Sequence, residues 1–147
     1  MSLTPPVLRD QSIVDAEYMR LLQIFHYILA GLALVGLGFL ALHYGVMHYV
    51  LTNLEMVQKQ KDGPPPEQIF ALLRWFYWIG GGLLLSMGTA NLLSGLFIRR
   101  RVNRLFSIII AGINCIQIPF GTALGVFTII VLMRDSVRES YSARNIP

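Results

Sequence analysis

The sequence is short and strongly apolar, and this sets its class before any motif is considered. It has 147 residues, of which 54% are hydrophobic and 14% charged, with a formal net charge of +4. A typical soluble domain carries about 25% charged residues. The composition therefore excludes an ordinary soluble domain. The single cysteine, Cys115, also excludes an intrachain disulfide.

Three long stretches without charged residues predict a polytopic, all-α membrane bundle. They cover residues 21–54, 75–98 and 105–133. A helix needs about 20 apolar residues to cross a hydrocarbon core roughly 30 Å thick, so each stretch is long enough. The predicted organisation is a flexible tail at 1–12, a single membrane domain at 13–138 and a C-terminal tail at 139–147. Within the membrane domain we predict an outer loop at 46–74 and spans at about 21–45, 75–98, 105–118 and 122–133.

The first stretch is too long for one simple crossing, and its aromatic residues indicate where the crossing lies. Ser12 and Asp15 have the spacing of an N-terminal capping box, which predicts a helix that begins near residue 13. Two His-Tyr pairs, at 26–27 and 43–44, are separated by about 25 Å of helix, a distance typical of two interfacial belts. Beyond Gly45 the apolar residues recur at helical spacing, which predicts an outer amphipathic extension.

The second stretch begins with an aromatic cluster at 75–78 and continues with many small residues. Pro66, the last of three prolines, is a suitable first residue for its helix. Glycine costs about 1 kcal/mol in a helix interior, so this many glycines need a reason. Close approach of another helix is the prediction, and a pore lined by small residues is the alternative. The small residues form two stripes: Gly81, Gly88 and Gly95 every seven residues, and Gly82, Ser86, Ala90 and Ser94 every four.

The third stretch is interrupted by Pro119-Phe120-Gly121, and two arrangements are open to it. If it crosses once as a kinked helix, the protein has three spans and the 12 basic residues divide equally between the two sides. If it turns back, nine of them lie on one side. Cytoplasmic segments carry an excess of Lys and Arg, which favours a hairpin. We therefore expect four helices, with both termini in the cytoplasm.

Two segments, at 111–115 and 118–132, resemble the C-terminal motif of a family of small bacterial inner-membrane proteins. Phe25-His26-Tyr27 and the prolines at 64–66 fit the same pattern. The resemblance implies a four-helix protein of the bacterial inner membrane. It implies no activity, because the family is functionally uncharacterised. Asn114 stands where an acidic residue is more usual in that family, so no ionisable role is implied there.

Residue patterns for catalysis or cofactor binding are lacking. The sequence has no nucleophile elbow, phosphate loop, metalloprotease motif or paired carboxylates, so we predict no enzymatic activity and no bound metal or cofactor. The three histidines, each followed by tyrosine, are predicted to be interfacial side chains. Haem ligation by His26 between two copies is a weaker alternative. No charged residue lies inside a predicted span, which argues against an ion-coupled pump.

Four arginines precede the third stretch and form its main basic cluster. They either set the orientation in the membrane or bind anionic lipid head groups, at about 1 kcal/mol per charge. Nucleic-acid binding is not expected, because the basic loop is short and has no folded module around it. The cluster consists of Arg99, Arg100, Arg101 and Arg104.

The small-residue faces favour a non-catalytic interaction protein, either a homo-oligomer or an accessory subunit of a membrane complex. Together with Gly121 and Gly125, they exceed what four short helices need among themselves. The alternative is a small conduit for an uncharged solute or ion, or a lipid-handling protein. Its candidate site joins polar residues within the spans to the hairpin tip: Asn91, Asn114, Gln117, Pro119, Phe120, Gly121 and Thr122.

Overall fold

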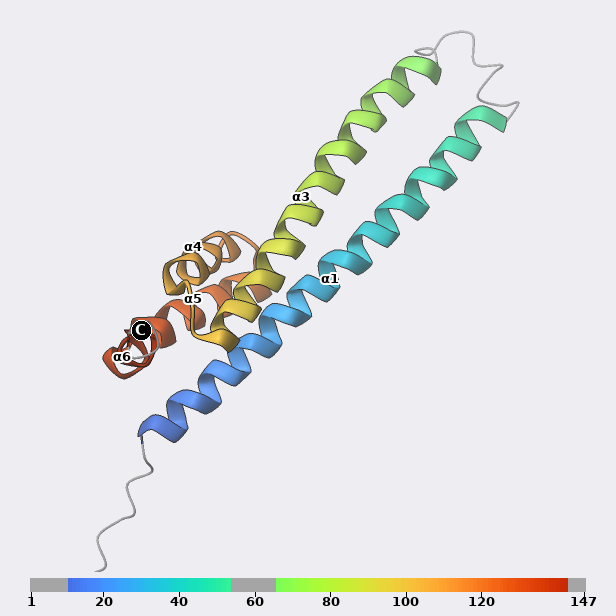
Figure 1. Cartoon of the computed structure of the whole chain (residues 1–147). Coiled ribbons are helices and arrows are strands. Elements are labelled where there is room, and N and C mark those ends of the chain that lie inside the picture. The colour runs from blue at the N-terminus through green and yellow to red at the C-terminus, as the bar shows by residue number, and fades with distance from the viewer. Residues whose placement is uncertain (1–10, 54–65, 143–147) are drawn as a thin grey trace, which may run out of the picture. The chain divides into compact units, whose positions relative to one another are not determined.

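The structure is a computed structural model, and it describes residues 11–53 and 66–142. Within these ranges the chain is all-α and contains no strand (Figure 1). The predicted fold class is therefore confirmed at this level. The helices are α1 (Gln11–Asn53), α3 (Pro66–Arg100), α4 (Arg104–Asn114), α5 (Phe120–Met133) and α6 (Asp135–Ser142).

Two of these helices are long and apolar enough to cross a membrane. The qualifying segments are Ile13–Val50 in α1 and Ala71–Arg100 in α3. At about 1.5 Å per residue each is longer than a hydrocarbon core of roughly 30 Å. α1 continues through Gly45 to Asn53 without a break, so the described part of the predicted amphipathic extension belongs to the same helix.

α1 is helical from Gln11 and α3 from Pro66, and each of these residues is the first of its described range. The starts predicted near residue 13 and at Pro66 therefore remain predictions. The first ten residues, positions 54–65 in the predicted outer loop, and the last five residues lie outside the described part of the chain.

The chain divides into two compact units. The two-helix unit (Ala30–Thr89) pairs the second half of α1 with the first half of α3. The C-terminal unit (Met1–Leu29 and Ala90–Pro147) contains the remaining parts of α1 and α3 together with α4, α5 and α6. Its buried hydrophobic core consists of Met19, Leu22, Ile98, Leu124, Val131, Leu132, Val137 and Tyr141.

The third apolar stretch folds back on itself instead of forming one kinked helix. α4 ends at Asn114, four residues before the prediction, and α5 begins at Phe120. The two helices pack closely: a Cβ built on Gly121 would lie 2.5 Å from the carbonyl oxygen of Asn114. Helices of 11 and 14 residues are about 17 and 21 Å long, so neither arm alone spans a 30 Å hydrocarbon core.

α6 was not predicted from the sequence. It is bent by 70° from α5, and Arg134 between them has an extended backbone. Val137 and Tyr141, four residues apart and so on one helical face, are buried in the core of the C-terminal unit. Packing of this face explains why a mostly polar segment, which the sequence assigned partly to a tail, is helical.

Candidate functional site

Asn91 of α3 and Asn114 of α4 form a buried amide pair. The Asn114 side-chain Nδ2 donates to the Asn91 side-chain Oδ1 at 2.8 Å, and the Asn91 Nδ2 donates in return to the Asn114 Oδ1 at 3.2 Å. The two residues are 2% and 0% exposed. Both residues belong to the candidate lining of the alternative conduit, but interhelical hydrogen bonding is the default role that we expect of amides inside a membrane bundle. Their reciprocal hydrogen bonds join two helices and agree with that default role.

Hydrogen bonds within the hairpin tip satisfy several of its backbone polar groups. The Gln117 backbone N–H donates to the Asn114 backbone carbonyl at 2.9 Å, and the Thr122 hydroxyl donates to the Cys115 backbone carbonyl at 2.7 Å. Pro119 and Phe120 are exposed at the turn. Thr122 thus supports the tip backbone, whereas the Asn114 side-chain amide bonds to Asn91 and the Gln117 side chain is exposed.

The seven-residue glycine stripe of α3 faces α1 within the same chain. In the two-helix unit, a Cβ on Gly88 would lie 3.1 Å from the Ala33 Cβ. In the C-terminal unit, a Cβ on Gly95 would lie 2.6 Å from the Tyr27 ring. This stripe is therefore used by intrachain packing and does not argue for a partner. In the second stripe, Ser94 is buried, Ala90 is half-buried, and Gly82 and Ser86 are exposed.

Sequence reasoning missed a second seven-residue stripe, on α1. Gly31, Gly38 and Gly45 are all exposed, and a Cβ at any of them would meet nothing within 4 Å. Residues seven apart lie on nearly one helical face. Their spacing, identical to that on α3, was the available signal. This open face is flanked by Leu34 and Leu42, which are 70% and 66% exposed.

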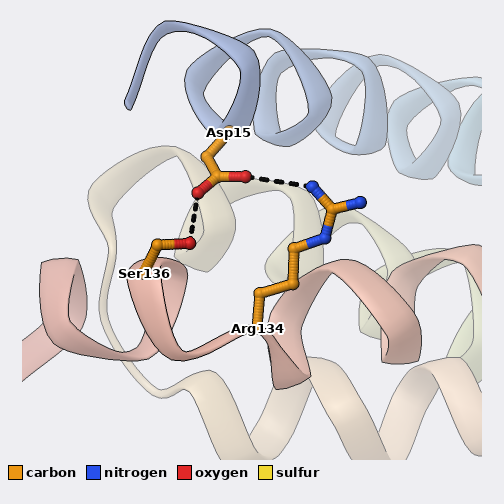
Figure 2. Close-up of polar contacts among 3 residues, drawn as sticks. All are labelled: Asp15, Arg134 and Ser136. Carbon is orange, nitrogen blue, oxygen red and sulfur yellow. Dashed lines mark hydrogen bonds and ion pairs between the residues drawn. The ribbon is translucent and has the colours of Figure 1, made fainter. Parts of the chain in front are cut away.

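A polar network ties the start of α1 to the bend between α5 and α6 (Figure 2). One Asp15 carboxylate oxygen accepts from the Arg134 guanidinium at 3.1 Å, and the other accepts from the Ser136 hydroxyl. The same guanidinium lies 5.1 Å from the Tyr18 ring centroid, within cation–π range. Asp15 is 4% exposed, and a buried carboxylate requires such partners.

Arg134→Gln is expected to lower the free energy of local opening of α6 by about 1 kcal/mol. The expected loss is small because the Arg134 side chain is 36% exposed and its charge is partly screened. Hydrogen exchange of the α6 amides should become about fivefold faster. Arg138→Gln, at an exposed position in α6, is the matched control and should leave exchange unchanged. Equal effects of both variants would contradict a specific role for the Asp15 network.

The predicted basic cluster is divided between exposed and structural positions. Arg99 and Arg100 are exposed, whereas Arg101 and Arg104 are half-buried. Arg104 donates from Nε to the Leu132 carbonyl at 2.6 Å, near the end of α5. Burial raises the pKa of the Tyr141 hydroxyl to about 12, and the charges of Arg101 and Arg104 oppose this rise. Arg101 and Arg104 therefore also interact with residues of the C-terminal unit.

The histidines differ in how far the protein itself buries them. His26 is fully buried, with Nδ1 2.9 Å from the Leu22 carbonyl. His43 is exposed, and its Nδ1 lies 2.6 Å from the Tyr77 hydroxyl. Across the described ranges, no three His, Cys, Asp or Glu side chains are grouped so as to hold a metal ion.

Within residues 11–53 and 66–142, the features described above are packing contacts, the Asn91–Asn114 amide pair, the Asp15–Arg134 ion pair and an open glycine face on α1. Comparison of the chain with family models, with curated proteins and with solved structures gave no match.

Proposed function

We propose that the protein is a non-catalytic membrane protein that associates laterally with another membrane helix through α1, most simply with α1 of a second copy. The observation that carries this proposal is the open face formed by Gly31, Gly38 and Gly45. Lipid tails are as apolar as leucine, so helices in a bilayer associate through close packing at small residues. Three glycines that make no close contact with the other described residues provide such a surface.

The proposal includes a membrane topology. α1 and α3 are the two spans, and the α4–α5 hairpin enters from the side that carries Arg99 and Arg100. The excess of basic residues on that side supports cytoplasmic termini, and the resemblance noted above supports the bacterial inner membrane. Large apolar side chains on both spans are exposed, such as Val35 and Leu83, at 69% and 61%. Exposure of this kind suits a lipid environment.

The conduit alternative receives less support. Asn91 and Asn114 bond to each other, and Thr122 bonds to the Cys115 carbonyl. These groups therefore have structural partners within the chain. Of the polar side chains in the proposed lining, that of Gln117 is exposed at the tip, as are its neighbours Pro119 and Phe120.

Gly38→Leu is expected to weaken self-association about tenfold, which corresponds to about 1.4 kcal/mol. The added side chain would hold the two backbones apart. Energy transfer between copies labelled at their termini, measured in vesicles of increasing lipid content, provides the readout. Gly112→Leu is the matched control, since Gly112 is also open but lies on α4. A parent chain that remains monomeric at every lipid dilution would sink the proposal.

A further inference from the structure

The two-helix unit contains an apolar groove between α1 and α3. Its volume is about 470 Å³, within the usual range for small-molecule sites. α1 contributes Leu37, Leu40 and Tyr44, and α3 contributes Arg74, Trp78 and Gly82 among others.

Small residues create this groove. At Gly88 the two helices are close enough for a Cβ to lie 3.1 Å from that of Ala33. Six residues earlier in α3, a Cβ on Gly82 would meet nothing within 4 Å. The lack of a side chain at Gly82 therefore leaves open space between larger neighbours such as Leu37 and Leu40. Helix packing alone does not fill it.

The two ends of the groove differ in chemistry. At one end lie aromatic residues that are fixed to one another: the Tyr44 and Tyr77 rings are 5.1 Å apart at near right angles. Aromatic residues of this kind concentrate where a bilayer meets water. Arg74 is exposed at the same end and makes no ion pair with the described residues. The groove then continues past Gly82 to Leu85, and its lining there is apolar.

We propose that this groove binds one anionic phospholipid of the bilayer, with its phosphate beside Arg74 and one acyl chain along Leu37, Leu40 and Gly82. A cation at the aqueous end and an apolar floor match the two parts of such a lipid. A basic residue at the surface favours an anionic over a zwitterionic head group by roughly fivefold. The inference rests on the membrane insertion proposed above.

A second copy of the chain matches the groove less well. The sequence has no acidic residue between Glu17 and Glu55 or between Glu67 and Asp135. Its long apolar helical stretches therefore offer no carboxylate to Arg74. A phospholipid carries a negatively charged phosphate next to its acyl chains, so the phosphate can lie beside Arg74 while an acyl chain lies along the apolar part of the groove.

Native mass spectrometry of the full chain provides the test, in micelles that contain equimolar phosphatidylglycerol and phosphatidylcholine. The parent should retain one phosphatidylglycerol per chain, at about a fivefold excess over phosphatidylcholine. Arg74→Gln should reduce this ratio to about one, and Arg74→Lys should preserve most of it. Gly82→Leu should fill the groove and lower retention of both lipids about tenfold.

Gly38→Leu is the matched control for Gly82→Leu, because both positions are open glycines in the two long helices. It should leave lipid retention unchanged even where it lowers the dimer signal in the same spectra. Loss of the dimer with intact lipid retention on Gly82→Leu would instead assign the groove to a second copy and overturn the inference. Equal retention of the two lipids by the parent would overturn it as well. Release of the chain from membranes by carbonate would separately refute the proposed insertion.

Discussion

Gly125→Ala is expected to give the largest loss of stability among alanine substitutions at the described glycines, about 3 kcal/mol. A Cβ at this position would overlap the Ala111 carbonyl oxygen and lie 2.6 Å from the Cys115 sulfur. The first of these is backbone, so α5 must move away from α4. The free energy of unfolding, measured by denaturant titration in mixed micelles, should fall accordingly.

Gly112→Ala provides the control for this result within the same hairpin. A Cβ on Gly112 would meet nothing within 4 Å, and alanine favours the helix by about 1 kcal/mol. This variant should be neutral or slightly stabilising. If both alanine variants changed stability equally, close packing of α4 against α5 would not be the reason that glycine occupies position 125.

Asn114→Leu is expected to lower the free energy of unfolding by about 2 kcal/mol, because it leaves the buried amide of Asn91 without its partner. Asn91→Leu should cost a similar amount. The double variant should cost less than the sum, with a coupling energy of about 0.6–2 kcal/mol. Unfolding titrations of the parent, both single variants and the double variant measure this cycle.

Gln117→Leu separates the amide pair from a general effect of removing an amide. Its side chain is exposed at the hairpin tip, so the change in stability should stay within about 0.5 kcal/mol. Strict additivity of Asn91→Leu and Asn114→Leu would show that the two amides act independently. A solute flux that survives in every variant would leave the amides with a purely structural role.

The described glycines fall into those that pack within the chain and those that lie on open surfaces. The glycines at positions 88, 95, 121 and 125 are used by packing within the chain. Those at positions 31, 38 and 45 are open, and so is the groove floor at Gly82. A partner helix and a lipid are therefore proposed for different surfaces, and a variant at one should leave the other intact.

Periodicity and charge distribution in the sequence were sufficient to predict most of the helical plan. The first two charge-free stretches predicted the two long helices α1 and α3. Pro119-Phe120-Gly121, together with the uneven distribution of arginines, predicted that the third stretch turns back. These features act locally or are counted along the chain, so they need no knowledge of distant contacts. The membrane orientation and the cytoplasmic termini remain predictions.

The tertiary structure decided how those helices use their side chains. The sequence singled out Asn91 and Asn114, but their bond across 23 positions depends on the register between α3 and α4. Likewise, α6 has a polar sequence and is helical because Val137 and Tyr141 pack into a core formed by residues far away in the chain. Spacing identifies a glycine stripe, yet whether it faces a neighbouring helix or open space is set by long-range packing. For this reason the face proposed for a partner helix lies on α1, whereas Gly88 and Gly95 of the seven-residue stripe on α3 pack against α1.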